Sequence, residues 1–264
     1  MTIISNFGET ITVTYSGAVG HIRLNRPAVR NAFDRGLIDA LTSAARWFDD
    51  EQEDIKVVIL SGEGKSFCAG FDLAQFSPLS NPEAVRSSVD AGRKMVQTIA
   101  KMRAITIAAV HGHCIGGGVL LAMACDFRYA SACAKFALPE TDLGIPLAWA
   151  GVPWLTREMG TLFAMEFILT CCEWSAAEAF SRGMLNSVVE PDRLISDVTT
   201  LAERLACHSP FILETTKAQF LAAKQDLCSD AHSFADAHLL HSALVDERSK
   251  LARKEYLAGR SKKA

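Results

Sequence analysis

The sequence lacks the features that mark secreted and nucleic-acid-binding proteins. Its eight cysteines are scattered over 264 residues without a Cys-x-x-Cys pair, which predicts free, buried thiols in a reducing compartment. The first residues contain no basic stretch followed by an apolar one, so a secretory signal peptide is not expected. The formal net charge of −3 argues against nucleic acid as the main partner.

An uninterrupted apolar run of membrane-spanning length is also missing. The longest candidate, from Ile105 to Phe127, is broken by His111, His113 and several glycines, so a strand followed by a buried helix explains it better. What the chain does have is a hydrophobic fraction of 49%, which is enough for a sizeable core. These properties predict a cytoplasmic protein that has no membrane and no nucleic acid among its partners.

Strand-like and helix-like segments alternate over most of the chain, which favours the α/β class. Strands are predicted at 11–15, 19–24, 57–60, 105–110, 126–130 and 135–138, and long helices at 37–48 and 83–102. From Gly151 onward only helical signals are found, among them a capping box from Ser175 to Glu178. We therefore predict an α/β core over residues 1–200 and a C-terminal helical region over 201–264.

Three consecutive glycines, Gly116, Gly117 and Gly118, lie between the strand-like run 105–110 and a helix-like run that begins at Val119. Glycine lets a turning backbone approach a ligand closely, and the first turn of a helix carries unpaired N–H groups and a positive dipole. This combination is suited to an anion or a developing oxyanion. Tight helix packing, or a turn that needs positive φ, is the structural alternative.

Four segments, in this order, carry a resemblance to a known family. They are 22–27 with 30–32 (IRLNRP and RNA), 67–73 (FCAGFDL), 111–118 (HGHCIGGG) and 136–146 (FALPETDLGIP). Over nearly its whole length the chain resembles the enoyl-CoA hydratase/isomerase, or crotonase, superfamily. The resemblance implies a crotonase-like spiral of repeated ββα units, a C-terminal helical trimerisation region, and assembly as a homotrimer or hexamer. It also implies an acyl-CoA thioester substrate, with no cofactor beyond its coenzyme A moiety.

The same resemblance assigns roles to individual residues. In this family two backbone N–H groups hold the thioester oxygen, and by motif they belong to Phe71 and Gly117. Such preorganised donors stabilise the charge of an enolate, and losing one typically costs about 3–4 kcal/mol. Arg30 is suited to the phosphates of CoA, as is Lys65 unless it is a solvated turn residue. The expected substrate contacts are Arg30, Ala32, Lys65, Ala69, Gly70, Asp72, Leu73, Gly116, Leu120, Leu143 and Trp149.

The acid–base residues separate two reactions within the family. Its hydratases use two glutamates to hold and split a water; this chain has Leu120 at the first position and Glu140 at the second. Leu120 can neither orient nor activate water, whereas a single carboxylate among apolar walls has a raised pKa and can carry a proton along the substrate. The pattern resembles the Δ3,Δ2-enoyl-CoA isomerases, so isomerisation by Glu140 is expected.

Two other functions stay open at this stage, an enoyl-CoA hydratase (a lyase) of fatty-acid β-oxidation and a catalytically weak acyl-CoA-binding protein. A hydrolase would need a water-activating partner that the sequence does not show. Asp126 is expected to have a structural role, and Trp149 and Trp154 to shape the acyl pocket unless they only pack. His238 and His241 have helical spacing but no accompanying acid–His motif, so no metal site is predicted.

Overall fold

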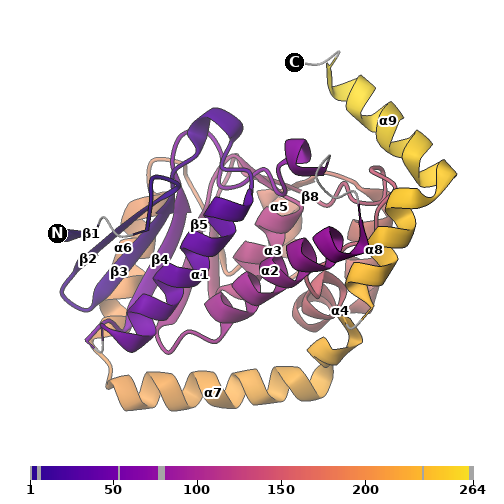
Figure 1. Cartoon of the computed structure of the whole chain (residues 1–264). Coiled ribbons are helices and arrows are strands. Elements are labelled where there is room, and N and C mark those ends of the chain that lie inside the picture. The colour runs from indigo at the N-terminus through magenta and orange to yellow at the C-terminus, as the bar shows by residue number, and fades with distance from the viewer. Residues whose placement is uncertain (1, 5–6, 53, 77–80, 234, 262–264) are drawn as a thin grey trace.

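The computed structural model describes residues 2–4, 7–52, 54–76, 81–233 and 235–261. A seven-stranded sheet with the order β1-β2-β3-β4-β5-β7-β10 forms one side of the molecule (Figure 1). Its first three strands are antiparallel and include the predicted hairpin: β1 (Thr2–Ile4), β2 (Ile11–Ser16) and β3 (Val19–Leu24). From β3 onward the neighbouring strands are parallel.

The parallel part of the sheet is covered on both faces. Its further strands are β4 (Val57–Gly62), β5 (Ile105–Val110), β7 (Phe127–Ser131) and β10 (Ser187–Val189). The main core, with residues of helix α1 (Arg35–Asp50), lies on one side, and helix α6 (Leu194–Ala206) packs against β4 and β5 on the other. Every residue of β5 is buried, which is typical of a parallel strand between two helical layers.

A second, three-stranded sheet runs beside the first. It consists of β6 (His113–Ile115), β8 (Lys135–Ala137) and β9 (Trp174–Ser175). The chain alternates between the sheets: β5 and β6 precede helix α3 (Gly117–Ala124), and β7 and β8 precede helix α4 (Gly151–Thr170). Each of these two repeats thus contributes one strand to each sheet and then a helix. This is the repeated ββα unit that the resemblance implied.

The remaining helices complete the layers around this core. They are α2 (Pro82–Ala100), α5 (Ala176–Ser181), α7 (Pro210–Leu227), α8 (Asp236–Val245) and α9 (Glu247–Ser261), with short 3-10 turns at Pro27–Val29, Leu73–Phe76 and Asp230–Ser233. Figure 1 shows α7 along the periphery and α9 projecting from the body. The capping box at the start of α5 is confirmed, because Ser175 and Glu178 satisfy each other's backbone N–H groups.

The expectation of only helical structure after Gly151 is wrong at two places, β9 and β10. Both strands are very short, and β10 adds to the sheet by pairing with β7 rather than through any periodicity of its own. The prediction for the cysteines is partly wrong as well. All eight thiols are free, but only three are buried, and Cys133, Cys172 and Cys207 are exposed.

A buried ion pair links the C-terminal region to the core. Lys217 of α7 places its Nζ 2.6 Å from Asp126 and donates a hydrogen bond to the carbonyl of Ala104. Asp126 also accepts hydrogen bonds from the backbone N–H and the hydroxyl of Thr106. The structural role expected of Asp126 is therefore confirmed. Within the described ranges, no helix is both long and apolar enough to cross a bilayer.

Candidate active site

The glycine turn leads from β6 into α3. Gly116 has φ 55° and ψ −122° and is the N-cap of α3, so the helix has no capping side chain and begins with Gly117. A β-carbon on Gly116 would lie 2.8 Å from the Oε1 atom of Glu140, so the carboxyl group lies directly against this turn. The N–H of Gly117 belongs to the first helical turn, where backbone donors lack partners within the helix. The helix start predicted after the glycines is thus present.

The segment that contains Phe71 is held in an extended pairing with an earlier turn of the chain. The N–H of Phe33 donates to the carbonyl of Gly70, and the N–H of Asp72 donates to the carbonyl of Phe33. In such a parallel bridge the backbone groups of the middle residue, Phe71, point away from Phe33. A β-carbon on Gly70 would lie 3.4 Å from the amide nitrogen of Gly117. The two segments predicted to hold the thioester oxygen therefore meet.

Glu140 reaches the same place from the neighbouring strand. β6 and β8 pair in parallel with Ile115 opposite Ala137, and the N–H of Gly116 donates to the carbonyl of Ala137. Parallel strands end at the same edge of a sheet, so the turn after Ala137 carries Glu140 beside the glycine turn. The hydroxyl of Thr141 donates to a carbonyl at the end of α4 and anchors this turn.

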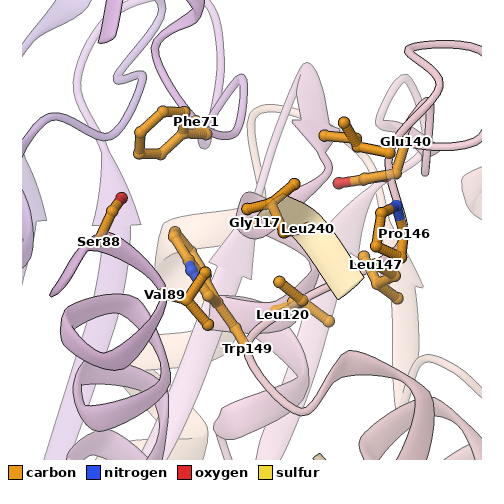
Figure 2. A pocket seen from close by; sticks show the side chains of 12 residues that line it. Phe71, Ser88, Val89, Gly117, Leu120, Glu140, Pro146, Leu147, Trp149 and Leu240 are labelled. Carbon is orange, nitrogen blue, oxygen red and sulfur yellow. The ribbon is translucent and has the colours of Figure 1, made fainter. Parts of the chain in front are cut away.

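A cavity of about 500 Å³, which we call the Trp149 cavity, lies between these segments. Its wall comes from the Phe71 segment, α2, the first turn of α3, the 140–149 segment and α8: Phe71, Ser88, Val89, Gly117, Leu120, Glu140, Ile145, Pro146, Leu147, Ala148, Trp149 and Leu240. Figure 2 shows Glu140 and Leu120 at the wall of this one cavity. Glu140 is the only ionisable side chain among these lining residues of the described structure.

Burial changes the acid–base properties of Glu140. One of its oxygens, Oε2, is buried without a hydrogen-bond partner in the described structure. Loss of hydration raises the pKa of Glu140 from 4.5 to about 7, because it disfavours the charged form. The expectation of a raised pKa among apolar walls is confirmed. A carboxyl group with this pKa can both accept and return a proton near neutral pH.

A second cavity of about 390 Å³, the Tyr256 cavity, adjoins the first. It is lined by Ala69, Gly70, Phe71, Leu73, Ile115, Gly116, Pro139, Glu140, Leu143, Ile145 and Tyr256. Phe71, Glu140 and Ile145 belong to both cavities, so the carboxyl group lies at the junction between them.

Arg30 and Lys65 lie on segments that are joined to the Phe71 segment by hydrogen bonds, although neither residue lines either cavity. The carbonyl of Arg30 accepts a hydrogen bond from the N–H of Ala69, which places Arg30 beside the Phe71 segment. The buried Asn31 donates to the carbonyls of Glu63 and Ser66 and so fastens this segment to the loop that carries Lys65. Arg30 and Lys65 are both exposed, and neither has an ion-pair partner in the described part of the chain.

Two other expected substrate contacts, Asp72 and Ala32, interact with Arg26 instead. Arg26 forms ion pairs with Asp34 and Asp72 at 2.8 and 3.5 Å, and it donates to the carbonyl of the buried Ala32. Asp72 also accepts a hydrogen bond from the N–H of Ala74, as a cap of the following turn. Neither Asp72 nor Ala32 lines either cavity, so both hold the backbone around the site.

Several lining residues were not expected from the sequence. Ser88 and Val89 come from α2 and Leu240 from α8, and no motif marks them because they reach the cavity only through tertiary packing. Trp149 lines the Trp149 cavity as expected. Trp154 does not: it lies in the first turns of α4 and faces a different cavity beside Met123. The expectation that Trp154 shapes the acyl pocket is therefore wrong.

Comparisons with known proteins agree with this architecture. A family model described as enoyl-CoA hydratase/isomerase matches residues 14–263. A probable enoyl-CoA hydratase of Rhizobium meliloti is 39% identical over 201 residues, which cover 76% of this chain and 77% of that protein. The peroxisomal Delta(3,5)-Delta(2,4)-dienoyl-CoA isomerase of Arabidopsis thaliana is 34% identical over 229 residues, which cover 82% of each chain.

The fold is shared with solved structures as well. A probable enoyl-CoA hydratase from Mycobacterium smegmatis superimposes with a TM-score of 0.81 at 30% identity, covering 88% of this chain and 93% of that one. Hydratases and an isomerase are thus both similar to this chain. On the family match, the two-sheet ββα architecture and the enzyme-like site, the chain belongs to the enoyl-CoA hydratase/isomerase family of enzymes.

Proposed function

We propose that this chain is an acyl-CoA enzyme that moves a double bond from the third to the second carbon of the acyl group. The observation that carries the proposal is the lining of the Trp149 cavity. Glu140 is its one ionisable side chain in the described structure, and Leu120 stands where the family's hydratases have their first glutamate. A single proton carrier in an apolar cavity is suited to isomerisation and poorly suited to the addition of water.

The thioester oxygen is held by the N–H groups of Phe71 and Gly117. As the neighbouring carbon loses its proton, negative charge moves onto this oxygen, and two fixed donors stabilise the charge without reorganisation. The side chain of Phe71 takes no part in the chemistry and forms a wall shared by the two cavities. The meeting of the Gly70 and Gly117 backbones supports this assignment.

Glu140 carries the proton. As a carboxylate it removes a proton from the carbon next to the thioester, and the C–H bonding electrons move into the conjugated enolate. The neutral carboxyl then returns the proton two carbons further along the acyl chain, at the far end of the original double bond. The new double bond lies next to the thioester, and Glu140 is again a carboxylate. A pKa of about 7 suits both the removal and the return of the proton near neutral pH.

The coenzyme A moiety is assigned to the other side of Glu140. The Tyr256 cavity includes Gly70 and Leu143, and the exposed Arg30 and Lys65, on segments joined to the Phe71 segment, offer positive charge. Arginine and lysine are suited to phosphate oxygens. The acyl group then occupies the Trp149 cavity.

A homotrimer, or a hexamer of two trimers, is proposed as the assembly. Support comes from large apolar side chains that are exposed in the single chain, among them Leu162 of α4, Phe211, Phe220 and Leu227 of α7, and Leu251 of α9. Exposed apolar residues gathered on the C-terminal helices indicate a protein interface. Sedimentation or light scattering checks the mass of the assembly.

The function is tested by incubating the protein separately with 3-enoyl-CoA and trans-2-enoyl-CoA and following the products by mass spectrometry and NMR. Isomer at unchanged mass is expected, whereas a gain of one water would identify a hydratase instead. Binding without turnover would identify an acyl-CoA-binding protein.

A substitution of the proposed base tests the mechanism. Glu140→Gln is expected to abolish isomerisation while the affinity for CoA esters stays within a few-fold, because the amide keeps the shape but cannot accept the proton. The same exchange at the exposed Glu190 is the matched control. Turnover that survives in Glu140→Gln would show that another group is the base.

A further inference from the structure

Two polar groups interrupt the otherwise apolar wall of the Trp149 cavity on the side away from Glu140. They are the hydroxyl of Ser88 and the indole Nε1–H of Trp149. Figure 2 shows Ser88 and the nitrogen-bearing edge of Trp149 on the side of the cavity opposite Glu140. Neither group has a hydrogen-bond partner in the described ranges of the chain. Polar groups in an apolar cavity fix the orientation of a ligand.

The indole of Trp149 is held firmly in this position. Its ring lies against two glycines, because a β-carbon on Gly92 would lie 2.3 Å from Nε1 and one on Gly117 would lie 2.6 Å from Cζ3. Phe33 packs edge-on against it at 5.5 Å between ring centroids. The side chain is only 7% exposed, so the indole ring as a whole is fixed, and its Nε1–H can donate a hydrogen bond to a water or to a ligand.

The backbone at Trp149 is also fixed. Trp149 and Ala150 have φ values of 61° and 60°, which side-chain-bearing residues rarely adopt. The N–H of Ala150 donates to Asp236 of α8 at 2.9 Å, so a neighbouring helix holds this turn in place. A residue kept in an unfavourable conformation by surrounding contacts is commonly part of a functional site.

Ser88 lies one helical turn from the point where α2 contacts the indole. Residues four apart share one face of a helix, so Ser88, which lines the cavity, lies on the same face of α2 as Gly92, which abuts Trp149 beside its Nε1 atom. The hydroxyl can donate or accept, and the indole can only donate. Both residues line the same side of the Trp149 cavity, so one ligand can contact both groups.

We propose that the acyl group of the substrate carries an uncharged oxygen, as a hydroxyl or keto group, on the part of the chain that reaches Ser88 and Trp149. This inference rests on the proposed function, since it assigns the Trp149 cavity to the acyl group. The Nε1–H donates to that oxygen, and the Ser88 hydroxyl completes its hydrogen bonding. A plain alkyl chain leaves both groups unpaired when it displaces water, and an oxygenated chain does not.

The oxygen is uncharged because nothing at this end of the cavity would neutralise a charge. No lysine or arginine belongs to the lining of the Trp149 cavity in the described structure. A carboxylate placed there would lose its hydration without gaining a cation and would repel the ionised form of Glu140. The site therefore discriminates between neutral acyl groups, by the presence and position of one oxygen.

The test measures binding with thioesters that cannot react. Hexanoyl-CoA and octanoyl-CoA are compared by calorimetry with counterparts that carry one hydroxyl at successive carbons beyond the reacting ones. At least one hydroxylated thioester is expected to bind about three- to ten-fold more tightly than its parent, which is the range for one uncharged hydrogen bond. If none binds more tightly than its parent, the inference is overturned.

Two variants on different elements locate the effect. Ser88→Ala and Trp149→Phe are each expected to reduce the hydroxylated-to-plain affinity ratio to about one. Their matched controls are Ser87→Ala, an exposed serine of α2 that contacts Arg35, and Trp154→Phe; both should keep the wild-type ratio. If both cavity variants keep the wild-type ratio of hydroxylated to plain affinity, the inference is also overturned. If one variant fails to fold, the ratio measured for the other variant decides the outcome.

These results separate the inference from the proposed function. If plain 3-enoyl-CoA is isomerised but no hydroxylated thioester is preferred, only the inference fails. If the preference is found and is lost in the variants while no isomerisation occurs, only the proposed reaction fails. If no thioester binds, both fail.

Discussion

The burial of Glu140 predicts that this single side chain makes the stability of the protein depend on pH. The pKa of Glu140 is raised from 4.5 to about 7 in the folded state by loss of hydration. Below pH 4.5 the carboxyl is mostly protonated in both the folded and the unfolded state, so its burial does not lower the free energy of unfolding. Between pH 4.5 and about 7 the unfolded chain releases this proton and the folded chain keeps it, so stability falls as pH rises.

The size of the effect follows from the two pKa values. One pKa unit corresponds to about 1.4 kcal/mol, so the full difference is at most about 3 kcal/mol once the pH exceeds the folded value. Glu140→Gln removes the charge and keeps the shape. Its gain in unfolding free energy over the wild type is therefore expected to grow from near zero at acid pH to about 3 kcal/mol at about pH 8.

The assay is urea unfolding of both proteins at the same concentration across this pH range. Taking the difference between variant and wild type cancels the titration of all other groups and the energy of assembly. Glu190→Gln, which changes an exposed carboxylate, should give little difference at any pH. A Glu140→Gln difference that does not change with pH would refute the reasoning, because the carboxyl would then be hydrated in the folded protein.

Further predictions follow from the same contacts. The kcat/KM for 3-enoyl-CoA should rise with pH to half its maximum near pH 7, because the base must be ionised; a flat profile would exclude Glu140 as the base. Leu120→Glu should raise the rate of hydration of trans-2-enoyl-CoA, measured by the gain of water. Gly92→Ala should weaken acyl-CoA binding about ten-fold by calorimetry, since the new β-carbon would lie 2.0 Å from Trp149 and displace the indole. Lys217→Met should lower the unfolding free energy by about 3 kcal/mol in urea by leaving Asp126 without its cation.

The elements with a strong repeat could be predicted from the sequence. The hairpin, α1 and α2 all have enough residues for a period to show, and the fully buried helix after the glycines is marked by its apolar run instead. That Leu120 and Glu140 occupy one site could be predicted too, because the resemblance aligns them with the two glutamate positions of the family's hydratases. The structure places both residues in the wall of one cavity. The fold and the place of Glu140 beside the glycine turn thus followed from local pattern and motif.

The rest depended on contacts between distant segments. β6, β9 and β10 have two or three residues each, too few for an alternation to be read, and they form because neighbouring strands offer unpaired backbone groups. The wall residues Ser88 and Leu240 lie on helices whose facing side is set by packing. The positive φ of Trp149 has no sequence signal at all, since tryptophan does not favour it.

Because α8 contacts the turn at Trp149, the C-terminus of this protein can be shortened only up to that helix. Asp236 fastens the turn, and Leu240, one helical turn on, closes part of the same wall. A truncated chain that ends before α8, made to obtain a smaller or monomeric catalyst, would release the indole and open the cavity to water. Selectivity for the acyl group should disappear in such a fragment even if every residue around Phe71 and Gly117 is kept.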